Sequence, residues 1–311
     1  MRCFCVTQTL EAVIKLRLVL RRHPLLTPAA TRRGTDPPEA QGAQHSVLRT
    51  ASVLVLLVIA ATAAAQGEPS AQALVQRMKA ALEPARASTR TITLTVSGTS
   101  DSSSQSVARQ ARKQLADGNR SVTVMISPEG VRGTALLVLE PANGPATEWV
   151  YTPAVRRVRK IVPIGAFEAF LDSDFTYGDL GFVNLHDRTF TLLGSDSSKG
   201  APAYKVQEGI GSPWYYSQVI DWIATDTGLP LERDFFDTAK QLWKVERFDR
   251  MSVIDGVPTA QRIRMEDVQQ GGSSELQISE LHYDAVVPDD VFDPAMLPQL
   301  LKTNSPLWTG R

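Results

Sequence analysis

Cysteine is nearly absent from this chain of 311 residues. Its two cysteines, Cys3 and Cys5, both lie at the very N-terminus. Disulfide bonds, thiolate metal sites and a lipid-modified N-terminal cysteine are therefore excluded for the rest of the chain.

Histidine is almost as scarce, and the usual catalytic motifs are missing. Beyond residue 65 only His186 and His282 occur, so a histidine triad or zinc site would need one or both. His282 falls on a predicted strand and His186 in a predicted loop, and neither placement indicates catalysis. The sequence has no G-x-S-x-G elbow, H-E-x-x-H motif, P-loop or dinucleotide-binding glycine pattern. It therefore predicts no cofactor, no metal and no enzyme of these classes.

No hydrophobic run is long enough to span a membrane. The apolar run at residues 51–65 is shorter than the roughly 20 residues that a spanning helix needs. It follows Arg49 and ends in three alanines, which is typical of a secretory signal peptide cleaved after Ala65. The predicted organisation is an over-called start or long leader at 1–46, a signal peptide at 47–65, and a single domain at 66–311.

The chain also has no excess of basic over acidic residues. The whole chain has 33 Lys and Arg against 33 Asp and Glu. Because the leader is rich in arginine, residues 66–311 are mildly acidic. An exported, mildly acidic chain is a poor candidate for nucleic-acid binding.

Three closely spaced aspartates raise the question of a metal or catalytic site. Asp172 and Asp174 begin like a calcium loop, but Tyr177 and Val183 replace the turn glycine and the bidentate glutamate. A glycosidase acid/base pair is an alternative that spacing alone leaves open. The favoured interpretation is structural: the carboxylates cap a short helix at 175–180 or pair with nearby arginines.

Beyond the leader, local patterns indicate one helix followed by many strands. Apolar residues at helical spacing predict a helix over 71–82, which Pro84 ends. Polar and apolar residues then alternate with period two between Gly-, Asn-, Asp- and Pro-containing turns. The predicted strands cover residues 91–96, 121–126, 131–139, 149–151, 155–161, 189–193, 203–207, 215–223, 229–236, 242–248, 259–265 and 276–283.

Such a succession of short strands favours an antiparallel meander over β-α-β units. Strands at this spacing bend into a sandwich or a barrel-like sheet, so the predicted fold class is mainly β. Short helical pieces are expected at 165–180 and 294–301. The serines at 102–106 are interpreted as a hairpin tip.

Residues 149–161 combine an aromatic strand, a Pro-marked turn and a basic strand. Arg157 and Arg159 share one face of the basic strand, because side chains alternate along it. A solvated edge strand carries such charges to block aggregation. Alternatively, one of the two arginines points inward and holds an acidic segment or an anionic lipid headgroup.

The stretch 214–223 is apolar on both faces. Trp214, Tyr216 and Trp222 fall on one face, and Val219 and Ile223 on the other. Both faces are therefore expected to be covered. A curved sheet with a pocket on its concave side satisfies this pattern, and so does an ordinary strand buried on both sides.

These blocks together resemble the LolA-like family of outer-membrane lipoprotein-sorting proteins. The resemblance covers most of residues 71–301 and is carried by residues 127–135, 149–161, 173–180, 215–222, 229–231 and 288–292. One departure is Asp172, which stands where the family usually has glycine. The resemblance implies a strongly curved antiparallel sheet that forms an open, incomplete β-barrel, with helices as a lid and an apolar concave face for acyl chains.

It further implies a periplasmic, non-enzymatic carrier that binds a lipoprotein or lipid and moves it toward the outer membrane, beside an inner-membrane exporter. Burial gains about 0.8 kcal/mol per CH₂ of an acyl chain, so a dry groove suffices. The predicted inward cations are Arg157 and Arg159, with Asp174 and Asp179 as their partners. The predicted lid contacts are Phe167, Phe170, Phe175 and Tyr177, and the predicted groove lining is Trp214, Tyr216 and Trp222.

Two other functions fit the same sequence. A sensor module on this fold would bind lipoprotein and hold a stable protein partner, whereas the carrier is expected to be a monomer. A hydrolase would use Asp172 and Asp174 and would turn substrate over. The cargo of a carrier could be a lipoprotein, a free lipid or a hopanoid-like molecule.

Overall fold

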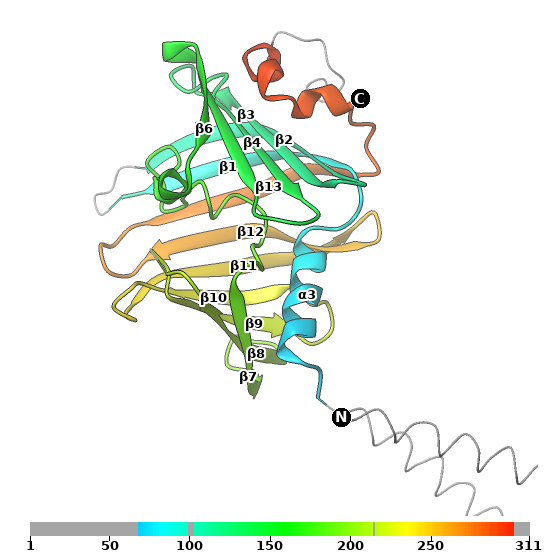
Figure 1. Cartoon of the computed structure of the whole chain (residues 1–311), viewed down its shortest axis with the longest axis vertical. Coiled ribbons are helices and arrows are strands. Elements are labelled where there is room, and N and C mark those ends of the chain that lie inside the picture. The colour runs from blue at the N-terminus through cyan, green and yellow to red at the C-terminus, as the bar shows by residue number, and fades with distance from the viewer. Residues whose placement is uncertain (1–67, 99–102, 214, 302–311) are drawn as a thin grey trace, which may run out of the picture. The chain divides into compact units, whose positions relative to one another are not determined.

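The computed structural model describes residues 68–98, 103–213 and 215–301, which belong to one compact unit (Figure 1). In the part of the chain that the structure describes, one α-helix, α3 (Ala71–Leu82), precedes a sheet of 13 strands. The strands are β1 (Ser88–Ser97), β2 (Ser103–Leu115), β3 (Gly118–Ser127), β4 (Ala135–Pro141), β5 (Thr147–Thr152), β6 (Arg157–Ile161), β7 (Arg188–Asp196), β8 (Ala203–Ile210), β9 (Gln218–Ala224), β10 (Pro230–Phe236), β11 (Leu242–Ile254), β12 (Val257–Asp267) and β13 (Ser273–Tyr283). Short 3₁₀ helices span Pro153–Val155, Pro163–Phe167, Asp289–Phe292 and Pro294–Gln299.

Helix α3 has the bounds that the apolar spacing predicts. Ser70 caps its N-terminus, because the Ser70 hydroxyl accepts a hydrogen bond from the Ala73 amide at 3.2 Å. Leu74, Val75 and Met78 form its buried face. They pack against residues of β8 and β9, so the helix covers that end of the sheet.

The sheet confirms the predicted fold class. All strand pairs are antiparallel, and the order is β6-β5-β4-β3-β2-β1-β13-β12-β11-β10-β9-β8-β7. Strands β6 and β7 follow one another in sequence but form the two opposite edges. The curved sheet therefore stays open, and the chain between its edges must cross the open side (Figure 1).

Strand β2 is absent from the sequence prediction, which assigned residues 102–106 to a hairpin tip. Ser103–Leu115 instead forms a full strand between β1 and β3. The stretch contains Arg, Gln, Lys and Ser with few large apolar side chains, so it lacks the alternation that identifies a half-buried strand. Strand β4 also begins at Ala135, four residues later than predicted.

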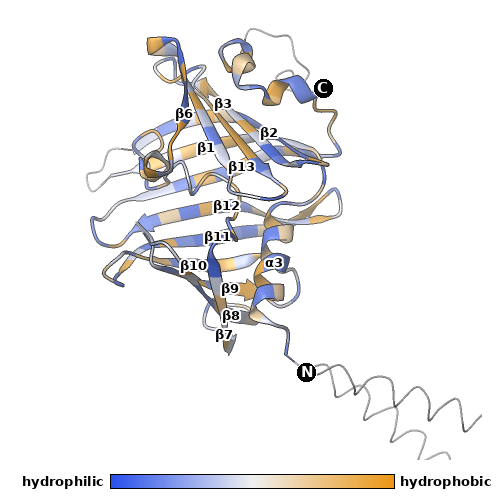
Figure 2. Cartoon of the chain, in the orientation of Figure 1, coloured by the Kyte–Doolittle hydropathy of each residue, from blue (hydrophilic) through white to orange (hydrophobic). Residues whose placement is uncertain are grey.

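Strands β3 and β4 are covered on both faces. Met125, Leu136 and Val138 point to the concave side, where they join one hydrophobic cluster. Val124 and Leu137 point to the other side, where the C-terminal segment with Phe292 and Leu297 packs on them. Hydrophobic and hydrophilic residues are interleaved along most other strands (Figure 2).

Residues 162–187, which we call the crossing segment, join edge strand β6 to edge strand β7. The predicted helix at 165–180 is wrong: only Pro163–Phe167 is helical, and it is a 3₁₀ helix. The rest consists of turns and one isolated bridge between Ala169 and Thr176. Gly165 lies within this piece and Gly178 and Gly181 follow it, and glycine is a poor helix former.

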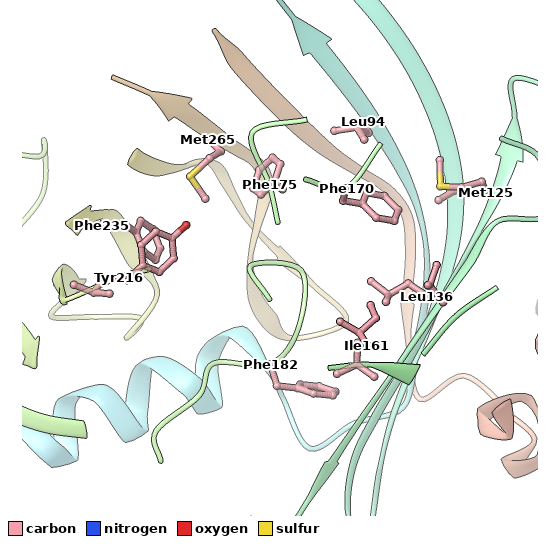
Figure 3. Packing of buried hydrophobic residues seen from close by; sticks show 14 residues of the cluster. Leu94, Met125, Leu136, Ile161, Phe170, Phe175, Phe182, Tyr216, Phe235 and Met265 are labelled. Atoms are coloured by element: carbon pink, nitrogen blue, oxygen red, sulfur yellow. The ribbon is translucent and has the colours of Figure 1, made fainter. Parts of the chain in front are cut away.

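The crossing segment inserts aromatic side chains into the concave side of the sheet. Phe170, Phe175 and Phe182 are 5%, 1% and 8% exposed. They belong to one cluster with Leu94 of β1 and Leu136 of β4 (Figure 3). The main core of the protein thus lies between the sheet and this segment.

Within the described residues, no helix is both long and apolar enough to cross a membrane.

Candidate functional site

A cavity of about 550 Å³ lies on the concave side, next to the crossing segment. Sheet strands, the C-terminal end of α3 and the crossing segment all contribute to its wall. Its apolar lining includes Ile92, Ile161, Phe175, Phe182, Val219, Phe235, Phe248, Ile263, Leu276 and Ile278. Its polar lining includes Glu83, Arg90, Gln110, Arg112, Glu140, Glu148, Asp179, Arg188, Arg233 and Glu246. The cavity therefore has both apolar and ionisable walls.

Hydrogen bonds within the crossing segment give it a defined shape. The Ser173 amide donates to the Phe170 carbonyl at 3.0 Å across Leu171 and Asp172, whose φ angles are +50° and +57°. This is the backbone of a type I′ turn, which favours Gly, Asn or Asp. Asp172 thus stands at a left-handed position, where glycine has the least steric cost.

Thr176 and Asp179 cap each other rather than a helix. The Thr176 amide donates to Asp179 Oδ2 at 2.9 Å, and the Asp179 amide donates to Thr176 Oγ1 at 3.1 Å. The predicted helix at 175–180 is replaced by this hydrogen-bonded turn. The prediction that an aspartate here caps a helix is therefore wrong, and Asp179 closes a turn instead.

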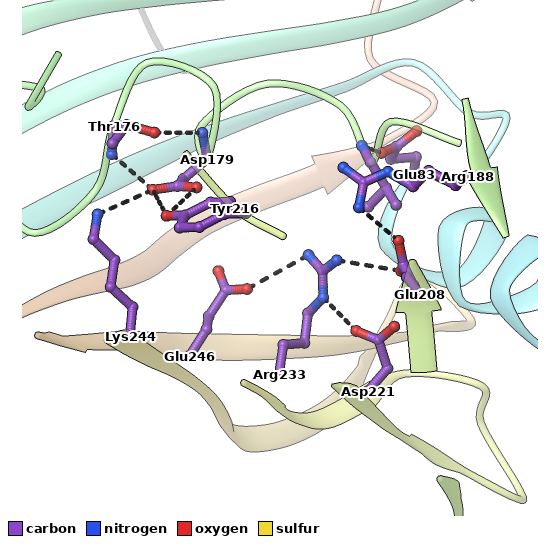
Figure 4. Close-up of polar contacts among 11 residues, drawn as sticks. Glu83, Thr176, Asp179, Arg188, Glu208, Tyr216, Asp221, Arg233, Lys244 and Glu246 are labelled. Carbon is purple, nitrogen blue, oxygen red and sulfur yellow. Dashed lines mark hydrogen bonds and ion pairs between the residues drawn. The ribbon is translucent and has the colours of Figure 1, made fainter. Parts of the chain in front are cut away.

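Three side chains hold the crossing segment down: Lys244 and Ser274 from the sheet, and Tyr216 from the loop before β9. Lys244 of β11 is 4% exposed, donates to the Asp174 carbonyl at 2.6 Å and lies 3.6 Å from Asp179 Oδ2. The Tyr216 hydroxyl donates to the same Asp179 carboxylate at 3.2 Å (Figure 4). Ser274 of β13 bonds to Asp174. These contacts place the charge of Lys244 where it compensates the buried carboxylate of Asp179.

Aromatic contacts surround the same attachment. The ring centroids of Phe167 and Tyr215 are 5.2 Å apart, and those of Phe167 and Trp243 are 5.3 Å apart. The Phe170 and Tyr177 rings meet edge to face at 5.6 Å. All the predicted lid residues thus lie in the crossing segment, with Phe170 and Phe175 buried and Phe167 38% exposed.

Neighbouring strands β7 to β11 carry a row of charged side chains on the concave face. Arg233 Nε donates to Asp221 at 2.7 Å, and its other nitrogens lie 3.6 Å from Glu208 and 3.7 Å from Glu246 (Figure 4). Arg188 donates to Glu208 at 2.9 Å. The carboxyl groups outnumber the guanidinium groups, and burial raises the pKa of both Glu208 and Glu246. The row therefore carries more acidic groups than its arginines neutralise, which favours the protonated form of these two glutamates.

Glu148 of β5 is a buried carboxyl group without an ion pair among the described residues. It is 9% exposed, and its Oε2 has no hydrogen-bond partner. Burial, and secondarily the charge of Asp179, raises the pKa of Glu148 to about 7. The cavity wall consequently includes an acid that gains or loses its proton near neutral pH.

The predicted pairing of Arg157 and Arg159 with Asp174 and Asp179 is wrong. Arg157 is exposed on edge strand β6, and Arg159 forms its ion pair with Glu168 at 2.7 Å. Lys244 takes the predicted place of the arginines. The edge position explains the difference, because a strand with a free edge exposes its long charged side chains to water.

Of the predicted groove-lining residues, Trp222 lies outside the cavity, so that prediction is wrong for Trp222. Tyr216 lines the cavity, whereas Trp222 lies on the opposite face of β9 from Val219 and Asp221. There its indole nitrogen donates to Asp196, and Lys199 and Lys205 cover its ring. Strand β9 begins only at Gln218, so the assumed alternation did not continue through 214–217. Trp214 lies outside the described residues.

Asp172 is exposed, and neither Asp172 nor Asp174 lines the cavity. No group of three or more His, Cys, Asp or Glu positioned for a metal ion occurs in residues 68–98, 103–213 and 215–301. The residues that sequence reasoning missed are Lys244, Ser274, Glu148, Arg90 and Arg112. A signal existed for Lys244 and Glu246, which alternate with apolar neighbours in a strand that the sequence identifies.

The chain is similar to known proteins in both sequence and fold. A family model with the description "Uncharacterized protein" matches residues 117–299. No curated protein matches the sequence. A solved outer membrane lipoprotein-sorting protein domain from Vibrio parahaemolyticus is 24% identical, with a TM-score of 0.67, covering 73% of this chain and 97% of that one.

Two further structures share the fold. A DUF1329 family protein from Desulfovibrio piger is 25% identical with a TM-score of 0.66, and the match covers 73% of this chain and 95% of that one. A LolA superfamily protein from Nitrosomonas europaea is 19% identical with a TM-score of 0.58, covering 72% of this chain and 98% of that one. The chain therefore belongs to the family whose model matches residues 117–299, and its open antiparallel sheet has the fold of the LolA superfamily structure and the lipoprotein-sorting domain.

Proposed function

We propose that the chain is an exported carrier that binds the acyl chains of a lipoprotein or lipid on the concave side of its sheet and moves this cargo toward the outer membrane. In this proposal the signal peptide at 47–65 is cleaved after Ala65, and residues 66–311 act in the periplasm. The protein is a monomer that receives its cargo beside an inner-membrane exporter, and it carries out no catalytic step.

One observation carries the proposal: the crossing segment fills an apolar concavity with aromatic side chains beside a cavity of about 550 Å³. That volume lies within the range of about 300–1,000 Å³ that is usual for small-molecule sites. Phe170, Phe175 and Phe182 occupy space that acyl chains could take if the segment moved. Each buried CH₂ would contribute about 0.8 kcal/mol, which offsets the loss of these aromatic contacts.

The attachment of the crossing segment supports a movable cover. Lys244, Ser274 and Tyr216 hold it through contacts to Asp174 and Asp179. Each of these hydrogen bonds involves a charged group, so exchanging one for water costs about 1.5–3 kcal/mol. The likeness to an outer membrane lipoprotein-sorting domain supports this cargo class.

Native mass spectrometry of residues 66–311, purified gently from the periplasm, tests the proposal, with organic extraction of any bound species. A stoichiometric acylated molecule is the expected result. A clean apo mass, together with no uptake of a fluorescent fatty acid, would refute the carrier function.

A matched pair of variants localises the binding. Ile263→Trp places a large ring at the cavity wall, whereas Val253→Trp places the same ring at a position that is 70% exposed. Uptake of the fluorescent fatty acid should fall in Ile263→Trp and persist in Val253→Trp. Equal uptake by both variants would move the binding site away from this cavity.

A further inference from the structure

Two arginines lie side by side at the end of the cavity nearest the C-terminus of α3. Arg90 belongs to β1 and Arg112 to β2. Arg90 is opposite Gln110 in the antiparallel register, and Arg112 lies two residues further along β2 on the same face. Both line the cavity, so two positive charges share its wall at this point.

Their donor groups are largely unused. Arg90, which is 9% exposed, has one hydrogen bond, from Nη2 to the Ser88 hydroxyl at 3.2 Å. Arg112 has one long contact, from Nη1 to the Leu82 carbonyl at 3.5 Å. Both Nε atoms are buried without a partner. Neither arginine forms an ion pair with any part of the chain that the structure describes.

The nearest carboxylates are engaged elsewhere. Lys79 of α3 binds Glu83 at 2.6 Å and Glu140 at 2.7 Å. Glu140 also accepts a hydrogen bond from Asn119, and Glu83 accepts one from the Val183 amide. These acids act on the arginines only through space, and a buried guanidinium without hydrogen-bonded compensation is costly.

The electrostatics agree with this geometry. Burial, and secondarily the charge of Arg112, lowers the pKa of Arg90 to about 9. Burial also lowers the pKa of Arg112. A bound anion would relieve both effects, because it supplies the opposite charge and accepts the unused N–H groups.

We propose that Arg90 and Arg112 form a subsite for a phosphate monoester, carried by the same ligand whose acyl chain occupies the apolar part of the cavity. The inference rests on the proposed carrier function. Guanidinium groups bind phosphate oxygens through paired hydrogen bonds. The hydroxyl groups of Thr259 and Tyr283, 3.2 Å apart, line the cavity too and add polar partners.

The apolar wall continues directly from this subsite. Ile92 follows Arg90 on the same face of β1, and the Phe182 ring lies under the Arg112 guanidinium at 5.4 Å. A ligand anchored by its phosphate at the arginines would therefore direct its chain toward Ile92, Ile278 and the aromatic side chains of the crossing segment. The site thus selects for amphiphiles with an anionic head.

Two ligands that differ only in the phosphate test the subsite: palmitoyl lysophosphatidic acid and monopalmitoylglycerol. Calorimetric titration of residues 66–311, below the micelle-forming concentration of either lipid, gives both affinities. We expect the phosphate-bearing lipid to bind about tenfold more tightly or better. Equal affinities would overturn the subsite and leave the carrier function standing, whereas no binding of either lipid would overturn the carrier function itself.

Substitutions assign the preference to the arginines. Arg112→Gln and Arg90→Gln should each remove most of the preference for the phosphate while the affinity for monopalmitoylglycerol changes by less than about twofold. Arg157→Gln, at an exposed arginine of β6, is the matched control and should keep the preference. A preference that survives both buried substitutions would refute the assignment, and the wild-type comparison stands even if a variant fails to fold.

A third titration with inorganic phosphate identifies the source of the anion. Weak binding that competes with the lysophospholipid supports a headgroup subsite. Strong binding of inorganic phosphate that is lost in Arg112→Gln, with no contribution from the acyl chain, would show a site for free phosphate and overturn the headgroup assignment.

Discussion

Asp174 and Ser274, 100 residues apart in sequence, exchange two hydrogen bonds. The Asp174 amide donates to Ser274 Oγ at 2.9 Å, and the Ser274 hydroxyl donates to Asp174 Oδ2 at 2.6 Å. Ser274 is only 1% exposed. One serine of β13 therefore ties both the backbone and the side chain of the crossing segment to the middle of the sheet.

Substitution Ser274→Ala should loosen the crossing segment. It removes both hydrogen bonds and leaves a partly buried carboxylate and amide unsatisfied, which costs about 1–3 kcal/mol. Hydrogen exchange at residues 168–180 should accelerate more than exchange at β3 and β4. Ser252→Ala, at a partly exposed serine of β11, is the control. A uniform acceleration across the sheet would contradict this local role.

Substitution Lys244→Met should have a larger effect. The lysine is the cation next to the buried Asp179, and removing one partner of a buried pair costs about 3–5 kcal/mol. Urea unfolding measures the loss of stability, with exposed Lys240→Met as the control. A double variant with Asp179→Asn should recover part of the loss, because no uncompensated charge then remains. Additive losses would argue against the pairing.

Glu148 should make stability depend on pH. The pKa of Glu148 is raised from 4.5 to about 7 in the folded protein. The contribution of Glu148 to the free energy of unfolding is therefore greatest below pH 4.5, and it is lost as the pH rises through about 7. Glu148→Gln should remove this decline, which amounts to at most about 3 kcal/mol. Unfolding curves across this pH range measure it, with exposed Glu129→Gln as the control. An unchanged pH dependence in Glu148→Gln would show that Glu148 is ionised in the folded state.

Asp172→Gly should leave the protein as stable as before or stabilise it by up to about 1 kcal/mol. The backbone of Asp172 has a φ of +57°, which glycine adopts without the steric cost that a side chain brings. Asp172→Ala should destabilise by about 1 kcal/mol, since alanine lacks the polar side chain that tolerates this conformation. Thermal unfolding of the two variants gives the comparison. A destabilised glycine variant would assign the aspartate side chain a role of its own.

Elements that depend on local residue patterns can be predicted from the sequence. The helix at 71–82 has both an apolar stripe and a terminating proline, and the structure reproduces its bounds. Most strands show period-two alternation because one face meets the core and the other meets water. These local signals are sufficient to predict the fold class. The sequence blocks that carry the family resemblance, taken in their order along the chain, are sufficient to suggest it.

The candidate site was harder to predict because its walls are not uniformly apolar. Strand β2 escaped detection since its inward face carries Gln110 and Arg112, and those same residues line the cavity. The pairing of Lys244 with Asp179 depends on the crossing segment passing over β11. No local pattern encodes that passage, which follows from β6 and β7 being opposite edges.

That edge-to-edge connection also has a mechanical consequence. The two ends of the crossing segment are fixed to the two edge strands of the sheet, β6 and β7. The length of this segment therefore limits how far the two edges can separate. In the proposed carrier, a ligand that spreads the sheet would pull the crossing segment away from Lys244 and Ser274. Because the order of the strands joins both edges to this one segment, widening of the opening and release of the cover would then be coupled.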